Sequence, residues 1–173
     1  RKREKWGFCT PDKKIIIECV YDWAVAFSEG MAMVKLNDKW GFIDKTGNVI
    51  VPFIYDDVER FSNGLAIVKI DDLCGLIDKN GNIVVPFIYE DIKLFSDELL
   101  RVSVKMYGGC GFIDKLGNVL TACIYDDSIW WIFSEGLVDV GLNGNSGFLN
   151  KSGNVVVPFI YDDVERFSNG LAI

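Results

Sequence analysis

The chain repeats one motif five times, and this periodicity restricts its fold more than any other feature. The clearest copy of the motif runs from Lys39 to Leu73. A glycine that follows Trp, Cys or Ser marks each copy, at Gly7, Gly41, Gly75, Gly111 and Gly147, so the periods are 34, 34, 36 and 36 residues. A fixed period of this length predicts a repeat architecture, in which each repeat packs against its neighbours. The five repeats span residues 6–39, 40–73, 74–109, 110–145 and 146–173.

Within a repeat, short apolar runs alternate with turn residues. In the second repeat, residues 41–43 lead through Asp44–Asn48 into residues 49–51. Such runs, rich in Val, Ile and Phe, are typical of strands and are too short for helices. The Asp-Lys-x-Gly-Asn step predicts a hairpin turn whose glycine takes a positive φ. A fourth, weaker strand is expected near Asp57–Phe61.

Four short antiparallel strands per repeat are the content of a propeller blade. We therefore expect an all-β fold in which residues 1–173 form a single repeat domain, a closed five-bladed β-propeller-like toroid. Residues 1–5 would complete the last blade, and closure would pair the strands at the two ends and hide their edges. An open β-solenoid of stacked hairpins is the alternative.

Composition excludes several classes of protein. Half of the residues are hydrophobic and 13% are aromatic, which is enough for a core. No apolar run approaches the length of about 18 residues that a membrane span needs. The net charge of -7 argues against nucleic acid binding, which needs a basic face. The basic stretch Arg1–Lys5 lacks a following apolar region and is not a signal peptide, so the compartment is left open.

The five cysteines take positions that other repeats fill with large apolar residues, which predicts reduced thiols buried in the core. Disulfides and a metal site are minor alternatives. The chain has no histidine and no Cys-x-x-Cys, which removes the usual zinc arrangements. Reduced core thiols would mildly favour a cytoplasmic protein. The cysteines are Cys9, Cys19, Cys74, Cys110 and Cys123.

The order of the motif residues resembles one known family. Trp-Gly is followed by Phe-Ile-Asp-Lys-x-Gly, then by Val-Pro-Phe-x-Tyr-Asp-Asp and Phe-Ser-x-Gly-Leu-Ala, as in the bacterial WG-repeat family. The resemblance covers essentially the whole chain, although Cys74, Cys110 and Ser146 replace the tryptophan. It implies a bacterial-type β-repeat protein that binds other molecules, and it supplies no catalytic residue.

Acidic residues are frequent, but their repetition argues against catalysis. Pairs such as Asp56-Asp57 and Asp162-Asp163 recur at matching positions in the repeats. A catalytic site needs two carboxylates that their surroundings make different, whereas a repeated acid more often satisfies backbone N–H groups in a turn. We therefore expect no enzyme, with no catalytic, cofactor-binding or metal-binding residues. A propeller-type glycoside hydrolase is the least favoured hypothesis.

The favoured function is a non-catalytic binding or scaffolding module that recognises a protein partner or another copy of itself. Carbohydrate or small-molecule binding in the channel or mouth of the ring is the alternative. Candidate binding residues are those where the repeat is irregular: Trp130 and Trp131 lie in a two-residue insertion, and Tyr107 lies in the other irregular segment, one repeat earlier. Trp23 also departs from the repeat, where others have an acid, and we attribute this to the variability of a terminal repeat.

Overall fold

The computed structural model describes residues 4–94, 99–104, 109–126 and 133–173, and these segments contain only strands and turns. The chain forms two compact halves: the N-terminal half (Arg1–Ile88) and the C-terminal half (Tyr89–Ile173). Each is described by itself. The all-β prediction is confirmed, and the described part of the chain contains no helix with the length and hydropathy of a membrane span.

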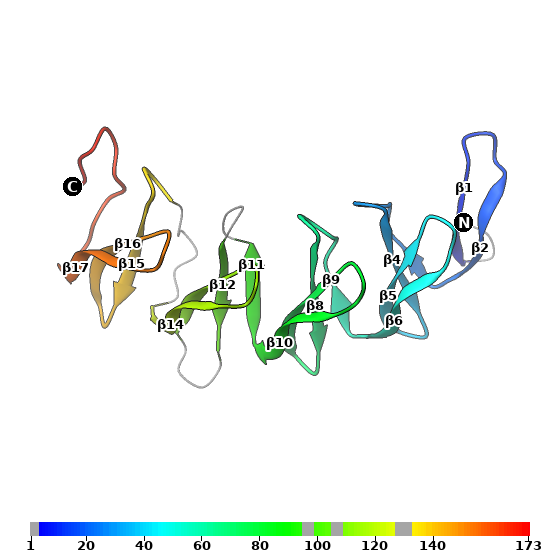
Figure 1. Cartoon of the computed structure of the whole chain (residues 1–173), viewed down its shortest axis with the longest axis horizontal. Helices are drawn as coiled ribbons and strands as arrows, with labels where there is room; N and C mark the ends of the chain where they lie inside the picture. Colours follow the sequence, from blue (N-terminus) through cyan, green and yellow to red (C-terminus); the bar gives the residue numbers. More distant parts are fainter. Residues whose placement is uncertain (1–3, 95–98, 105–108, 127–132) are drawn as a thin grey trace. The chain divides into compact units, whose positions relative to one another are not determined.

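The described residues of the N-terminal half form ten strands in three sheets (Figure 1). In each sheet, strands that follow one another in the chain lie side by side, in the orders β1-β2, β3-β4-β5-β6 and β7-β8-β9-β10. The strands are β1 (Trp6–Cys9), β2 (Ile15–Tyr21), β3 (Trp23–Ala24), β4 (Met31–Leu36), β5 (Lys39–Asp44), β6 (Val49–Tyr55), β7 (Asp57–Val58), β8 (Leu65–Ile70), β9 (Leu73–Asp78) and β10 (Ile83–Tyr89).

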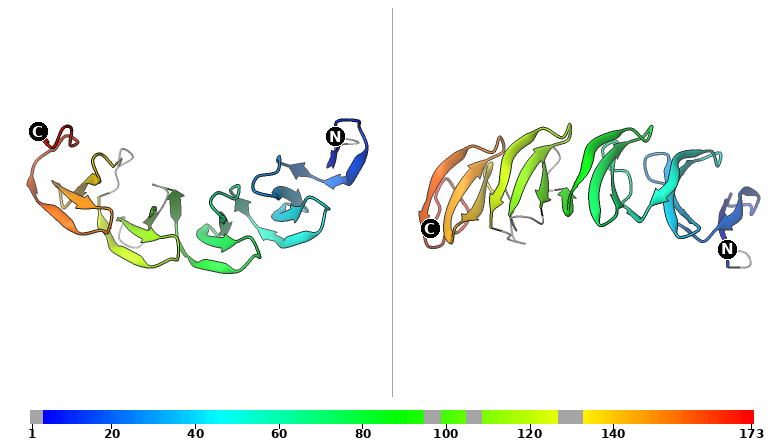
Figure 2. Two further views of the ribbon diagram at one scale, coloured as in Figure 1. Left: turned by 45° about the horizontal axis from the view of Figure 1, so that its top comes forward. Right: turned by 90° about the horizontal axis from the view of Figure 1, so that it is seen from below.

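The C-terminal half follows the same plan with two sheets, β11-β12-β13-β14 and β15-β16-β17. Figure 2 shows the twisted, meandering course of the individual sheets from two further directions. The strands are β11 (Asp91–Leu94), β12 (Leu99–Ser103), β13 (Cys110–Asp114), β14 (Val119–Tyr125), β15 (Leu137–Leu142), β16 (Asn145–Asn150) and β17 (Val155–Tyr161).

One sheet is not one sequence repeat. The repeat over residues 40–73 gives β5 and β6 to one sheet and β7 and β8 to the next. The chain stays within a sheet through the tight turn at Asn37-Asp38 and leaves it after Tyr55, where a single residue separates β6 from β7. The expected number of four strands per blade is therefore right, but the Trp-Gly landmark lies in the middle of a sheet. The fourth strand is shorter than expected, since β7 ends at Val58.

The glycine of the Trp-Gly pair has a steric cause. At Gly41 the pairing of β5 with β6 shifts register, and a Cβ atom there would lie 2.6 Å from the Val51 carbonyl oxygen. That distance is too short for any side chain, so the close approach of the two strands requires glycine. The same crowding recurs at Gly75 and Gly147.

The predicted hairpin turn at Asp44–Asn48 is confirmed. Asp44 N–H donates to the Asn48 carbonyl oxygen at 3.0 Å, Gly47 N–H donates to the Asp44 carbonyl oxygen at 3.1 Å, and Gly47 has a φ of 91°. The Asp44 carboxylate accepts hydrogen bonds from the N–H groups of Thr46 (2.8 Å) and Asn48 (2.9 Å). The aspartate is therefore part of the turn, as expected for a side chain that satisfies backbone donors.

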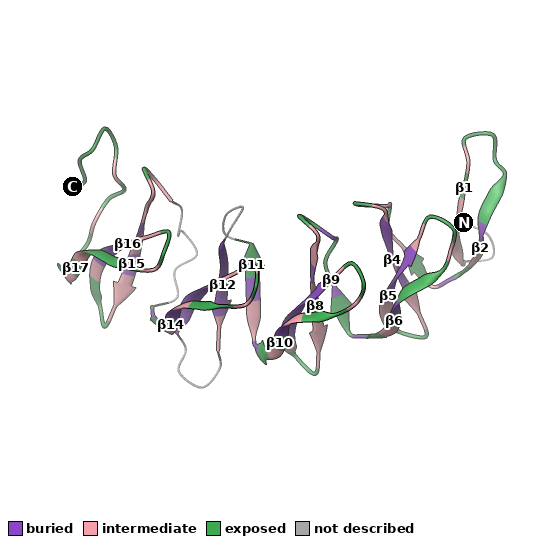
Figure 3. Cartoon of the chain, viewed as in Figure 1, coloured by how far each residue is buried: buried purple, intermediate pink, exposed green. Residues whose placement is uncertain are grey.

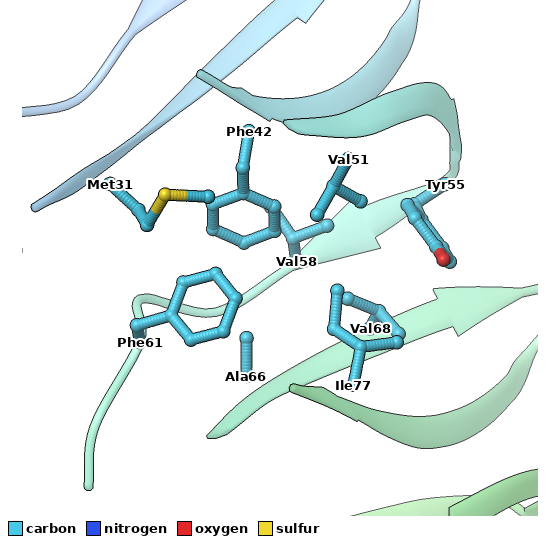
Figure 4. Close-up of a cluster of buried hydrophobic side chains, with 9 residues drawn as sticks. All are labelled: Met31, Phe42, Val51, Tyr55, Val58, Phe61, Ala66, Val68 and Ile77. Atoms are coloured by element: carbon cyan, nitrogen blue, oxygen red, sulfur yellow. The ribbon is translucent and has the colours of Figure 1, made fainter. Parts of the chain in front are cut away.

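The core of the N-terminal half lies between neighbouring sheets. Met31, Phe42 and Val51 of one sheet meet Phe61 and Val68 of the next, and the rings of Phe42 and Phe61 lie 4.7 Å apart in an edge-to-face arrangement (Figure 4). A second cluster joins β1-β2 to the β3–β6 sheet around Ile17, Tyr21 and Ile43. In the C-terminal half, the corresponding cluster is Cys110, Phe112, Tyr125, Val138, Val140 and Leu149.

Hydrogen bonds link turns one repeat apart. The Ser28 hydroxyl donates to the Phe61 carbonyl oxygen at 3.0 Å, and the Glu29 carboxylate accepts from the N–H groups of Asn63 (2.7 Å) and Gly64 (3.0 Å). Lys79 lies 3.0 Å from the same carboxylate, and this ammonium and the two N–H groups hold the pKa of Glu29 below its usual range. In the C-terminal half, Ser134 donates to the Phe167 carbonyl oxygen and Glu135 accepts from Gly170 N–H.

The cysteines are free thiols, but they are not all buried. Cys74 and Cys110 are buried as expected, whereas Cys9 is exposed. The corresponding Ile43 is covered because β5 pairs with β4, which places Ala32 opposite it; β1 pairs only with β2 in its two-stranded sheet. Cys19 and Cys123 are half-buried, like Phe53 at the equivalent position, because that position lies at the border of the core in every repeat.

Candidate functional site

The candidate residues singled out in the sequence, Trp130, Trp131 and Tyr107, lie outside the residues that the structure describes. Their role stays a prediction. The described residues instead draw attention to an aromatic pair that the sequence reasoning set aside.

Trp23 and Trp6 form an exposed aromatic pair in the N-terminal half. Their ring centroids lie 5.4 Å apart with the planes tilted by 47°, and Trp23 is 52% exposed. Trp23 begins β3 and pairs with Lys35 of β4, so its backbone is held in a sheet. Trp6 is the first residue of β1, so the two rings of the pair belong to two different sheets. The two indoles come from neighbouring sheets and contact each other. They therefore form a rigid apolar surface that remains open to a partner.

An ion pair lies directly beside these two indoles in the sequence. Lys5 binds the Asp22 carboxylate, and this hydrogen bond from the lysine holds the pKa of Asp22 below its usual range. Asp22 also accepts a hydrogen bond from Asn37 N–H at 2.8 Å, which fixes the carboxylate against the β4–β5 turn. The site therefore combines two aromatic rings with one fixed pair of opposite charges.

The position of Trp23 is what makes the pair specific to this end of the chain. Every other repeat carries an acid there, including Asp57 and Asp163. Asp57 shows the ordinary structural role, since its Oδ1 accepts a hydrogen bond from Val58 N–H at 3.0 Å. Since the other repeats have an acid here, the fold does not require the exposed tryptophan. In the sequence, the tryptophan in place of the acid of the other repeats is the signal that could have identified Trp23 as a candidate.

The last strand of each sheet exposes apolar side chains on the face turned away from the core. In β6, Val51 and Tyr55 are buried while Ile50 and Ile54 are exposed. Figure 3 marks the buried, intermediate and exposed parts of the strands. Exposed aliphatic residues at the same alternate positions are Ile16 and Val20 of β2, Ile88 of β10, Ile124 of β14, and Val156 and Ile160 of β17. Ile15, Ile83, Val119 and Val155 are exposed at the starts of the same strands. Repeated apolar surface on the edge of a sheet is a feature of proteins that bind other proteins.

The repeated acids after the second strand of the motif are occupied within their own turns. The Thr46 hydroxyl and the Asn48 amide bind the Asp44 carboxylate, and these hydrogen bonds lower the pKa of Asp44 to about 2. Asp78 and Asp114 bind the N–H groups of their turns in the same way. These carboxylates are therefore engaged as acceptors and are ionised in ordinary solution.

Comparison with known proteins assigns the chain to a family. The model of the WG-containing repeat matches five times, over residues 6–40, 40–74, 75–105, 111–145 and 147–173. The chain belongs to the WG-repeat family. The predicted resemblance is thereby confirmed over nearly the whole chain, including the repeats in which cysteine or serine replaces the tryptophan.

Other comparisons add less. Among curated proteins nothing matches this WG-repeat chain. Among solved structures it is similar to Hsv2 from Kluyveromyces marxianus, with 11% identity, a TM-score of 0.41 and coverage of 78% of this chain and 46% of that one. For Kluyveromyces lactis Hsv2 the identity is 12%, the TM-score is 0.40, and the coverage is 75% of this chain and 46% of that one. For virginiamycin B lyase from Staphylococcus aureus the identity is 19%, the TM-score is 0.36, and the coverage is 86% of this chain and 56% of that one. The WG-repeat chain thus spans about half the length of these proteins, and at these TM-scores the fold assignment rests on its own sheets and repeats.

Proposed function

We propose that this chain is a non-catalytic binding or scaffolding module whose partner is a protein, including a second copy of the chain. The observation that carries the proposal is Trp23, which is 52% exposed, packs on Trp6 and stands where other repeats have an acid. Exposed tryptophans with a fixed orientation are the residues that most often dominate protein interfaces. The exposed aliphatic residues of β2 and β6 in the same half support a protein partner.

A carbohydrate is the second candidate, because the same indole offers a flat face beside polar groups. Lys5 precedes Trp6 and Asp22 precedes Trp23, and their side chains supply a hydrogen-bond donor and an acceptor. Aromatic stacking combined with a few polar groups is a usual way to hold a small polar ligand. The exposed aliphatic strands have no place in sugar recognition, which is why the protein partner is preferred.

The experiment compares the wild-type chain with Trp23→Asp, which installs the residue that Asp57 represents in the template repeat. Sedimentation velocity over a range of concentrations measures self-association. The variant should weaken it by at least about 30-fold, the equivalent of the ~2 kcal/mol of an interface hot spot. Leu116→Asn is the matched control: Leu116 is 76% exposed in a turn, and the corresponding residue of another repeat is Asn80.

Each outcome of this experiment is informative. Equal association of wild type and Trp23→Asp would exclude the indole pair from the interface between copies. A monomeric wild type that binds a glycan array through Trp23 would favour the carbohydrate alternative. Unchanged far-UV circular dichroism in both variants is required, and we expect it because each installs the residue of another repeat.

We propose that the five repeats close into a five-bladed toroid, with an open β-solenoid as the alternative. Closure is supported by two partial sheets, one near each end of the chain, which together would make one complete sheet. Near the C-terminus, Glu165 N–H donates to the Ile173 carbonyl oxygen at 2.8 Å and Ser168 bridges to Leu171, as in the first two strands of a sheet. The hairpin β1-β2 corresponds to the last two strands. Deletion of residues 171–173 should then lower the melting temperature of the whole chain. Fraying of the last repeat alone would favour the solenoid.

The proposal that the module is non-catalytic has its own test. Asp57 is one of the repeated acids, and its carboxylate binds the backbone at Val58. The change Asp57→Asn should alter stability and leave any measured turnover unchanged. A glycosidase assay in which this one change abolishes turnover would contradict a non-catalytic module.

A further inference from the structure

The C-terminal half contains a small pocket lined by three carboxylates. The pocket has a volume of about 210 Å³ and lies between the β15–β17 sheet and the segment that follows β17. Asp126, Asp139 and Asp163 line it together with Gly141 and Ser146. It is smaller than the ~300–1,000 Å³ of sites for whole small-molecule ligands. Its size suits one side chain or the end of one.

The corresponding place in the N-terminal half carries larger side chains. In the β4–β5 pair, Lys35 stands opposite Trp40, and Met33 stands opposite Phe42. Met33 and Trp40 pack against the buried cluster between the sheets. Lys35 and Lys5 supply positive charge to Asp22, whose pKa is lowered by both, mainly through the hydrogen bond from Lys5. This half therefore provides both the bulk and the cations that its acids need.

In the C-terminal half, the same register contains three substitutions that converge on the pocket. Gly141 stands opposite Ser146, in the places of Lys35 and Trp40, and Asp139 stands in the place of Met33. The substitutions remove an indole and a lysine and add a carboxylate. The two acids that occur in the other repeats, Asp126 and Asp163, are retained. The pocket thus has more negative charge and less bulk than its counterpart.

Asp139 is the side chain that calls for a ligand. Its Oδ1 atom is buried and finds no hydrogen-bond partner within the part of the chain that the structure describes. Asp126 Oδ2 accepts from Gly144 N–H at 3.2 Å, and Asp163 Oδ1 accepts from Val164 N–H at 2.9 Å. A buried carboxylate oxygen without a partner loses the full free energy of its hydration. A hydrogen-bond donor that enters the pocket would compensate for this lost hydration free energy.

The identity of the donor follows from what the other half places there. Among the described residues, no group of three or more Cys, Asp or Glu side chains has the arrangement of a metal site. The counterpart holds lysine ammonium groups next to Asp22, and an ammonium has three donors on a narrow alkyl stem. We propose that this pocket binds a primary ammonium group on an alkyl chain, such as the lysine side chain of a protein partner.

The experiment measures binding of Nα-acetyl-lysine-N-methylamide to the ¹⁵N-labelled chain by the amide shifts of Gly141 and Ser146. Asp139→Asn should weaken binding at least tenfold, because it removes the charge and keeps the size. Gly141→Lys should abolish binding, because it supplies a tethered ammonium like that of Lys35. Asp162→Asn is the matched control, since it changes the net charge equally at an exposed acid that does not line the pocket.

The ligand arms separate the possible sources of the ammonium group. Nα-acetyl-norleucine-N-methylamide has the same stem without the charge and should not bind. If n-butylammonium binds as well as the lysine derivative, the source is a free amine; if only the lysine derivative binds, it is a protein side chain. Binding of calcium in preference to both, or equal weakening by Asp139→Asn and Asp162→Asn, would overturn the proposal.

Two further variants separate ammonium binding from instability of the Asp139→Asn variant and from the Trp23 surface. Asp139→Ile installs the residue found at Ile67 and should abolish binding even if the asparagine variant proves unstable. Trp23→Asp changes the proposed protein-binding surface in the other half and should leave ammonium binding unchanged. Failure of this pocket and failure of the Trp23 surface are therefore seen in separate variants.

Discussion

Replacement of Phe61 by alanine should be among the most destabilising single changes in the N-terminal half. Phe61 is 2% exposed and contacts Phe42 edge-to-face, with 4.7 Å between the ring centroids. Loss of a fully buried phenylalanine costs about 3–5 kcal/mol, which includes the cavity left behind. The edge-to-face contact accounts for ~0.5–1.5 kcal/mol of stability beyond buried area. We therefore expect the upper part of this range.

Phe167 provides a matched comparison within the same chain. It occupies the same place in the motif and contacts Phe148 at 4.8 Å, but it is only half-buried. The stabilisation from burial is roughly proportional to the apolar area removed from water, so Phe167→Ala should cost less than Phe61→Ala. The difference between the two variants thus isolates burial from the ring contact.

Hydrogen exchange measured by mass spectrometry is the appropriate assay, because repeat proteins can unfold in parts. Phe61→Ala should reduce the protection of β5, β6, β8 and β9, while the strands of the C-terminal half keep theirs. Urea unfolding of both variants supplies the free energies. Equal losses for Phe61 and Phe167, or a loss under about 1 kcal/mol for Phe61, would refute the assigned packing.

Three further predictions follow from other features. Cys9 should react with a thiol reagent within minutes in the native protein, whereas Cys110 should react only on unfolding; simultaneous labelling would contradict the exposure of Cys9 and the burial of Cys110. The folded pKa of Asp44, about 2, lies below its ordinary value of 3.8, so its stabilising effect is present above pH ~4 and is lost as the pH falls toward 2. Asp44→Asn should flatten acid unfolding in that window, and an unchanged profile would contradict this role. Glu29→Gln should accelerate amide exchange at Gly64, measured by NMR, because the carboxylate accepts that N–H.

The sequence predicts the strands and turns well because both depend on local chemistry. The turn at Asp44–Asn48 follows from the glycine and the flanking aspartate and asparagine, and the structure has the expected hydrogen bonds. The boundary of the sheets could not be predicted from the same information. Trp40 is the most visible landmark of the repeat, yet the chain passes from sheet to sheet after Tyr55. This tyrosine recurs in the motif, but a tyrosine followed by an acid does not by itself indicate a change of sheet.

The candidate sites were harder to predict because exposure depends on neighbouring sheets. Trp23 departs visibly from the repeat, but only the structure distinguishes an exposed indole from one that packs in the core. Likewise, Asp139, Gly141 and Ser146 are separate substitutions in the sequence. Their convergence becomes evident only when the register of β15 with β16 places Gly141 opposite Ser146.

The offset between repeats and sheets has a consequence for how such genes can grow. A duplicated segment that begins at one Trp-Gly and ends before the next encodes the last two strands of one sheet and the first two of another. Inserted into an array, it therefore restores every sheet to four strands, wherever between repeats it enters. Residues 155–173 match residues 49–67 at every position but one, as expected of a recent copying event. Because each copy is interleaved with its neighbours, recombination can change the number of repeats without leaving a half-finished sheet inside the array.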